Sequence, residues 1–173
     1  MCKVSEFEVV EYPNRDEWLA GRNRGIGASE VAAVMGLSSW ASPYSLWARK
    51  RGLATDELAN PVAASWGLKL ERVVADEYEL VRGKSLIDRG RWTVYRSKQT
   101  PCMIATLDRE IADVNGSGPG CLEIKTARSA DDWGEAPPMH YQMQLQSEES
   151  NNRVSVIAKK KSKRIYIYII INS

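Results

Sequence analysis

The sequence contains no long apolar run. Among its 173 residues, no uninterrupted hydrophobic stretch approaches the roughly 18 residues that a membrane helix needs. The first ten residues carry Ser5, Glu6 and Glu8 in place of the apolar centre of a signal peptide. We therefore expect a cytoplasmic protein that does not associate with membranes.

Cysteine and histidine are also scarce. Cys2, Cys102 and Cys121 are far apart and form no Cys-x-x-Cys pair, which excludes the usual zinc and iron-sulfur motifs. We expect these thiols to be reduced and buried. The single histidine, His140, excludes a multi-histidine zinc site and argues against a Ser/His or Cys/His hydrolase. We interpret His140 as a packing residue or as one that faces DNA.

Charge of one sign is not in excess. There are 24 Lys and Arg against 22 Asp and Glu, a formal net charge of +2, so attraction to nucleic acid must come from local patches. The hydrophobic fraction of 43% excludes disorder, and no linker is long enough to separate two domains. We expect one domain over residues 1–173.

Two helices are predicted in the first third of the chain. Asn14, with Glu17 three residues later, is typical of a capping box that opens a helix through Trp18. Ser42 is the expected N-cap of a second helix, which Gly52 should end.

The longest predicted helix opens at Asn60-Pro61 and ends at Gly83. Glu71 lies beside its apolar stripe, which has helical spacing. The stripe consists of Trp66, Leu70, Val73, Val74, Tyr78 and Val81. A further helix is predicted from about Pro138 to Glu148.

Strands are predicted from about Leu86 onward, where apolar residues alternate. The turn-forming residues 115–120 indicate a hairpin between the strands that flank them. The expected strands contain Trp92 and Val94, then span Met103–Leu107, Arg109–Val114, Cys121–Thr126, Arg153–Ala158 and Ile165–Ile171, with a turn at Lys159–Ser162.

A basic, glycine-rich stretch lies between the first two helices. It runs from Arg22 to Glu30 and continues into the apolar residues 31–35. Glycine lets a backbone approach closely, arginine offers a fork of donors, and a helix start presents free N–H groups. The stretch can therefore hold an anion, although for Arg22 alone a solvated surface position is an equal explanation.

The strand around Glu123 and Lys125 carries the strongest chemical signal. Side chains two apart in a strand share a face, so this carboxylate and this amine should project together while Leu122, Ile124 and Thr126 face the other way. With Asp108, the site would hold two carboxylates for a divalent cation and an ammonium to orient or deprotonate a water. Glu71 could supply a third carboxylate.

The triplet alone is weak, because an acid-x-Lys pattern occurs by chance about once in a chain of this length. Its alternative interpretation is a solvated strand pair. Further blocks strengthen it, since they fall in the order seen in a known family. These blocks are Trp18-x-x-x-Arg22, Gly25-Ile26-Gly27-Ala28-Ser29-Glu30-Val31, Ser42-Pro43-Tyr44-x-Leu46-Trp47, Gly67-x-x-Leu70-Glu71, Ala105-Thr106-Leu107-Asp108, Leu122-Glu123-Ile124-Lys125-Thr126 and His140-Tyr141-x-x-Gln144-x-Gln146.

On these blocks the sequence resembles the YqaJ-type viral recombinases, a lambda-exonuclease-like family of the PD-(D/E)xK nuclease superfamily. The resemblance implies an α/β (α+β) fold with a restriction-endonuclease-like core, a central mixed β-sheet flanked by helices. It also implies a 5′ to 3′ exonuclease that acts on double-stranded DNA ends in phage recombination, with Mg²⁺ as cofactor and Mn²⁺ as a substitute. The partners that it suggests are a single-strand annealing protein and further copies of the chain, in the cytoplasm of a bacterial host.

The resemblance also implies roles for individual residues. Asp108, Glu123 and the carbonyl of Ile124 would hold the metal ion, and Glu71 would complete a second metal site. Lys125 would activate the attacking water, and Gln144 would position that water or Lys125, unless it is a solvated helix residue. Arg22, Ser29 and Thr106 would bind the phosphate of the DNA end.

Some features fit less closely or admit other interpretations. Arg128 stands at a shifted spacing from the phosphate-binding arginine of the family, so no role is carried over to it. The basic run Lys159–Arg164 is either a solvated hairpin turn or a phosphate-contacting loop. The same core could also serve an endonuclease or nickase, or a catalytically inactive DNA-binding module.

Overall fold

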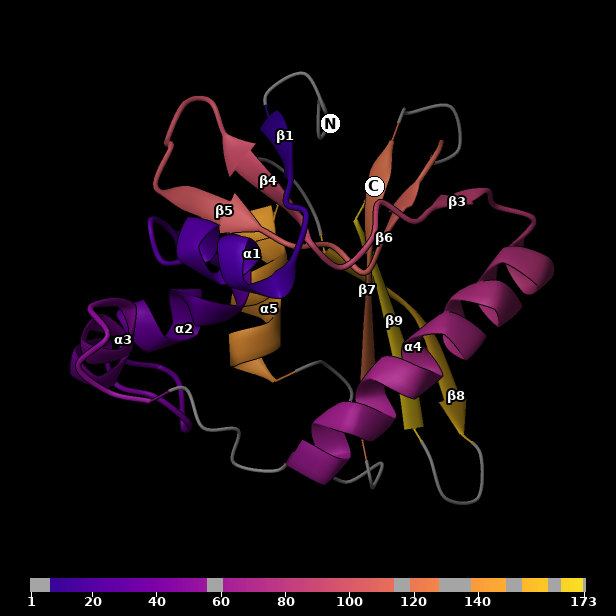
Figure 1. Cartoon of the computed structure of the whole chain (residues 1–173). Helices are drawn as coiled ribbons and strands as arrows, with labels where there is room; N and C mark the ends of the chain where they lie inside the picture. The colour runs from indigo at the N-terminus through magenta and orange to yellow at the C-terminus, as the bar shows by residue number, and fades with distance from the viewer. Residues whose placement is uncertain are drawn as a thin grey trace.

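A computed structural model of the chain describes residues 7–55, 61–113, 119–127, 138–148, 154–161 and 166–172. It has the α+β class expected from the sequence, with the strands distributed over two hydrogen-bonded sheets and helices packed around them (Figure 1). Within the described ranges, no helix is long and apolar enough to cross a membrane.

The first sheet has four strands in the order β1-β4-β5-β2. Its strands β1, β4 and β5 are antiparallel neighbours, whereas β2 runs parallel to β5. The bounds are β1 Phe7–Glu11, β2 Ile26–Gly27, β4 Thr93–Ser97 and β5 Met103–Ala105. A turn of 3-10 helix, η2 (Ala28–Glu30), follows β2 directly.

The second sheet has five antiparallel strands in the order β3-β6-β7-β9-β8. Their bounds are β3 Leu86–Ile87, β6 Arg109–Ile111, β7 Gly120–Ala127, β8 Val154–Lys161 and β9 Tyr166–Asn172. The predicted β6–β7 hairpin is confirmed by its pairing, while most of its turn, residues 114–118, lies outside the described residues. Because β7 lies between β6 and β9, it is the central strand of this sheet.

The helices begin where the capping residues predict. Asn14 precedes α1 (Arg15–Arg22), and its side-chain oxygen accepts the N–H groups of Asp16 and Glu17. Ser42 caps α3 (Pro43–Lys50) reciprocally with Ser45. The remaining helices are α2 (Val31–Val34), α4 (Pro61–Arg82) and α5 (Met139–Glu148).

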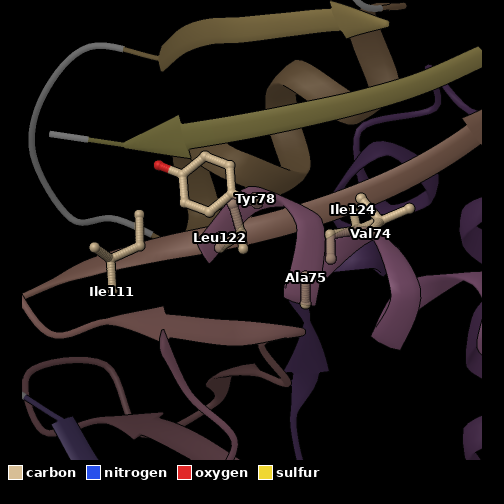
Figure 2. Packing of buried hydrophobic residues seen from close by; sticks show 6 residues of the cluster. All are labelled: Val74, Ala75, Tyr78, Ile111, Leu122 and Ile124. Carbon is tan, nitrogen blue, oxygen red and sulfur yellow. The ribbon is translucent and has the colours of Figure 1, made fainter. Parts of the chain in front are cut away.

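The main core lies between α4 and the second sheet. Val74, Ala75 and Tyr78 of the helix pack against buried side chains of β6 and β7, as Figure 2 shows. Those strand side chains are Ile111, Leu122 and Ile124. The alternation predicted for β7 is therefore confirmed, with Leu122 and Ile124 on the face that α4 covers.

The prediction that the apolar residues of α4 form a single stripe is partly wrong. Val74 and Tyr78 are buried, but Trp66, Val73 and Val81 are 58%, 62% and 66% exposed. A helix turns by about 100° per residue, so Val73 and Trp66 lie on the side of the helix opposite to Ala75 and Tyr78. The apolar residues of α4 thus occupy two faces, and the sheet covers one of them.

Three smaller expectations also need correction. Cys102 is exposed, because it lies in the turn that precedes β5, whereas Cys121 is buried as expected. Lys159–Lys161 belong to β8 and not to a turn, since they pair with β9. The strand expected through Leu107 ends at Ala105, because the chain there leaves the first sheet for the second.

Candidate active site

Strand β7 presents Glu123 on the face opposite to α4. The Glu123 side chain is buried, at 3% exposure, and its Oε1 accepts a hydrogen bond of 2.6 Å from Nε2 of Gln144 on α5. Gln144 is itself buried, so it is not the solvated helix residue considered as the alternative. The structure therefore brings together two residues that are 21 positions apart in the sequence.

Lys125 projects to the same side as Glu123, as strand alternation predicts. Its Nζ lies 2.5 Å from Oε1 of Glu123 and 5.3 Å from the ring centre of Tyr141 on α5. The aromatic ring and the carboxylate both favour a cation at this position. The Glu-x-Lys pair is consequently part of an enclosed cluster and not a solvated strand pair.

Asp108 reaches the cluster from the segment that joins the two sheets. Its Oδ2 accepts a 2.6 Å hydrogen bond from the backbone N–H of Ile124. Burial, followed by the charge of Glu123, raises the pKa of Asp108 to about 8, although Lys125 and the Ile124 N–H act in the opposite direction. Repulsion between converging carboxylates thus contributes to the raised pKa, but burial is the larger cause.

One carboxylate oxygen of the cluster is left without a donor. Oε2 of Glu123 is buried and has no hydrogen-bond partner among the described residues. A buried anionic oxygen without a partner is unfavourable, and the ionised form of Asp108 nearby would add like-charge repulsion. A hard divalent cation accepts oxygen ligands of this kind, so the residues present fit Mg²⁺.

Glu71 of α4 faces the same region but is engaged by Arg109. Nη1 of Arg109 lies 2.8 Å from Oε1 of Glu71, and its Nη2 lies 3.3 Å from Asp88. Glu71 is close enough for its charge to contribute to the raised pKa of Asp108. In the part of the chain that the structure describes, no three acidic, histidine or cysteine side chains are grouped to hold a metal ion.

The predicted phosphate-binding residues gather around Gly27. A Cβ atom at this position would come within 2.8 Å of Nη2 of Arg22, so only glycine lets the guanidinium lie against the backbone here. The Arg22 guanidinium also lies 4.9 Å from the ring centre of Trp18. Both contacts fix the direction in which the arginine points.

A partly buried ion pair supports the same segment. Nζ of Lys50 lies 2.7 Å from Oε2 of Glu30 and donates to the carbonyl of Arg22 at 3.1 Å. The same Glu30 oxygen accepts the N–H of Gly27 at 2.7 Å. Lys50 and Glu30 thereby tie α3, η2 and the end of α1 into one unit.

A pocket of about 180 Å³ joins the two halves of the site. The predicted phosphate-binding residues Arg22, Ser29 and Thr106 line it. So do three of the four predicted catalytic residues, Glu123, Lys125 and Gln144, whereas Asp108 lies outside the lining.

Sequence reasoning did not assign roles to several residues of the site. Three such residues contact the site: Arg109, Lys50 and Tyr141. The only sequence signals for them are that Arg109 follows Asp108, that Lys50 lies at the end of a predicted helix, and that Tyr141 follows His140. His140 stacks on Tyr141 with ring centres 4.2 Å apart, and burial, followed by the charge of Lys125, lowers its pKa. These contacts favour the packing interpretation of His140. Arg128 and residues 162–164 of the basic run lie outside the described residues.

Residues 17–149, which contain the whole pocket, match the model of the YqaJ-like viral recombinase domain. The chain belongs to this family. It is 34% identical over 136 residues to the uncharacterized protein YqaJ of Bacillus subtilis (strain 168), a match that covers 77% of this chain and 41% of that protein.

A second relative is protein D345L of African swine fever virus (strain Badajoz 1971 Vero-adapted). It is 42% identical over 77 residues, which cover 44% of this chain and 22% of that protein. The chain therefore spans less than half the length of these relatives. No solved structure matches it.

Proposed function

We propose that this chain is a Mg²⁺-dependent deoxyribonuclease of the viral recombination type, and that it degrades double-stranded DNA from its ends in the 5′ to 3′ direction. The observation that carries the proposal is the shared pocket, in which residues suited to a terminal phosphate face a buried carboxylate-lysine-glutamine cluster. A phosphate group held by Arg22, Ser29 and Thr106 would place the adjoining DNA strand beside Glu123 and Lys125. Membership in the YqaJ-like viral recombinase family supports the same conclusion.

Each residue of the cluster has a definite task in this proposal. Asp108, Glu123 and the carbonyl of Ile124 hold Mg²⁺, which when bound polarises the phosphodiester and lowers the pKa of its water; Mn²⁺ can substitute. Lys125 orients the attacking water or takes its proton. Gln144 fixes the carboxylate of Glu123 through the 2.6 Å hydrogen bond.

Glu71 has a conditional place in the proposed two-metal arrangement. It can join a second metal site only after its ion pair with Arg109 opens. The charges favour this exchange, since a second divalent cation would carry twice the charge of the Arg109 guanidinium that pairs with Glu71 in this structure.

The test uses linear duplex DNA labelled on one strand, with Mg²⁺, Mn²⁺ or a chelator. We expect release of nucleotides from the 5′ strand with either metal and none with the chelator. Lys125→Ala should abolish release while duplex binding persists, and Lys98→Ala, in the exposed turn between β4 and β5, should leave it unchanged. An intact duplex under every metal condition would refute the nuclease assignment and leave a DNA-binding module.

Covalently closed circular DNA separates the two nuclease classes. An exonuclease leaves this substrate intact, whereas an endonuclease or nickase opens it. Cleavage of the circle would overturn the end-directed part of the proposal and retain the metal chemistry. Resection from the 5′ end leaves a 3′ single strand, which is the substrate that an annealing protein in the host cytoplasm would take up.

A further inference from the structure

The outer face of α4 carries apolar side chains that the sheet does not cover. Trp66, Val73 and Leu80 are 58%, 62% and 80% exposed, and Val62 at the start of the helix is 67% exposed. Figure 1 shows α4 lying along the second sheet, which its other face contacts through Val74, Ala75 and Tyr78. Isolated apolar residues on a surface are ordinary, whereas several large ones aligned on one exposed helix face indicate an interaction site.

These residues form one regular stripe. Alternating steps of four and three residues connect Val62, Trp66, Lys69, Val73, Asp76 and Leu80. This is the spacing by which one helix packs along another with a small crossing angle. The stripe therefore suits a long helix, and α4, at 22 residues, is the longest described helix of the chain.

The stripe is also symmetric about Val73. Trp66 and Leu80 stand seven residues on either side, and Lys69 and Glu77 stand four residues on either side. The basic residues of the exposed face precede Val73 and the acidic residues follow it. An antiparallel copy of the same helix would thus place Val73 against Val73 at the centre, opposite charges on both sides of it, and Trp66 against Leu80 farther out.

We propose that this face of α4, defined by Trp66, Lys69, Val73, Glu77 and Leu80, forms a two-fold symmetric dimer with a second copy of the chain. Val73 of the two copies meets at the axis, Trp66 packs toward Leu80 of the second copy, and Lys69 faces Glu77 of the second copy. Lys69 lies 5.1 Å from the Trp66 ring centre in one chain, so the pair can present its charge and its ring together. The inference does not depend on the nuclease proposal.

Sedimentation velocity over a wide range of protein concentration tests the dimer. We expect a monomer–dimer equilibrium with a dissociation constant in the micromolar range. Val73→Glu should weaken dimerisation at least about tenfold, because it places two carboxylates at the axis. Leu68→Glu is the matched control, since Leu68 is similarly exposed (55%) but lies about 140° around the helix from Val73; it should leave the equilibrium unchanged. Unaltered melting of both variants would show that they fold.

A charge exchange tests the antiparallel pairing itself. Lys69→Glu and Glu77→Lys should each weaken the dimer, and the double variant should restore it, because the exchange recreates opposite charges across the interface. A wild-type chain that stays monomeric throughout, an assembly that Val73→Glu leaves intact, or a double variant no stronger than the single ones would overturn the proposal.

Discussion

Replacement of Asp108 by Asn should stabilise the protein while it removes a proposed metal ligand. The asparagine side-chain oxygen can still accept the hydrogen bond from the Ile124 N–H, so the local geometry has a means of persisting. The substitution removes the charge that burial and Glu123 disfavour. Fold and proposed function therefore make opposite demands on this residue.

The magnitude follows from the pKa of Asp108. A rise from 3.8 to about 8, at roughly 1.4 kcal/mol per pKa unit, sets a ceiling of about 6 kcal/mol on the cost of the ionised form. Asp108 keeps some contact with solvent, and effective screening in proteins reduces such energies, so we expect about 1–3 kcal/mol. For a chain of this size that corresponds to a rise in Tm of about 3–10 °C.

The pH dependence of the stability difference shows whether the ionisation of Asp108 causes it. Between pH 8 and pH 4, the folded protein holds a proton on Asp108 that the unfolded chain releases, so the wild type gains stability as the pH falls through this window. Asparagine has no such proton. The advantage of Asp108→Asn should therefore be largest above pH 8 and should shrink toward pH 5.

Thermal melting followed by circular dichroism without divalent metal, at pH 9 and pH 5, is the assay. Asp76→Asn is the control, because Asp76 is 69% exposed in its side chain and faces Arg72 at 3.9 Å; its effect should stay below about 0.5 kcal/mol. If Asp108→Asn melts at or below the wild-type temperature at pH 9, or if its advantage is the same at both pH values, the assignment of a raised pKa to Asp108 is refuted.

Three further predictions concern the metal, the phosphate side and the ion pair. Mg²⁺ at a concentration of 100 Kd should add about 2.7 kcal/mol to the free energy of unfolding and so raise the wild-type Tm. It should bind more weakly as the pH falls below 8, because Asp108 then takes up a proton. An unchanged Tm would count against a preformed site. Gly27→Ala should displace Arg22 and raise KM for 5′-phosphorylated duplex ends in a steady-state nuclease assay. Gly67→Ala is the control, because a Cβ atom there meets nothing within 4 Å. Equal KM values for the two variants would contradict the close contact between Gly27 and Arg22. Arg109→Met should destabilise the fold by about 3 kcal/mol in denaturant unfolding, because it leaves Glu71 unpaired. Glu71→Gln in the same chain should recover most of this loss, and no recovery would show that the ion pair does not stabilise the fold.

Local sequence signals predicted the elements well. Asn14 and Ser42 begin helices because their side chains satisfy free N–H groups at those starts, and this depends on neighbouring residues only. Strand alternation correctly predicted that Glu123 and Lys125 share a face, because it too depends only on local spacing along one strand. The fold class and the family also followed from the sequence, since ordered motifs over most of the chain are specific.

Contacts between distant elements were beyond the sequence alone. The pairing of Glu71 with Arg109 joins α4 to β6, and nothing local to either residue indicates it. The exposed side of α4 was missed because helical periodicity counts apolar residues without telling which face the sheet covers. The division of the strands into two sheets likewise depends on where the chain crosses, at residues 106–108.

That crossing explains how one small chain brings the proposed phosphate-binding residues to the carboxylate cluster. Arg22 and Ser29 are positioned by the first sheet and its adjoining helices, whereas Glu123 and Lys125 belong to the central strand of the second. Thr106 and Asp108 lie on the segment between them. Helix α5 contacts η2 and β5 on one side and β8 on the other, and its Gln144 bonds Glu123. Because α5 contacts both sheets, it helps to set the spacing between the proposed phosphate-binding residues and the carboxylates. Changes in this helix should therefore alter the proposed nuclease activity more than changes of equal size in α3.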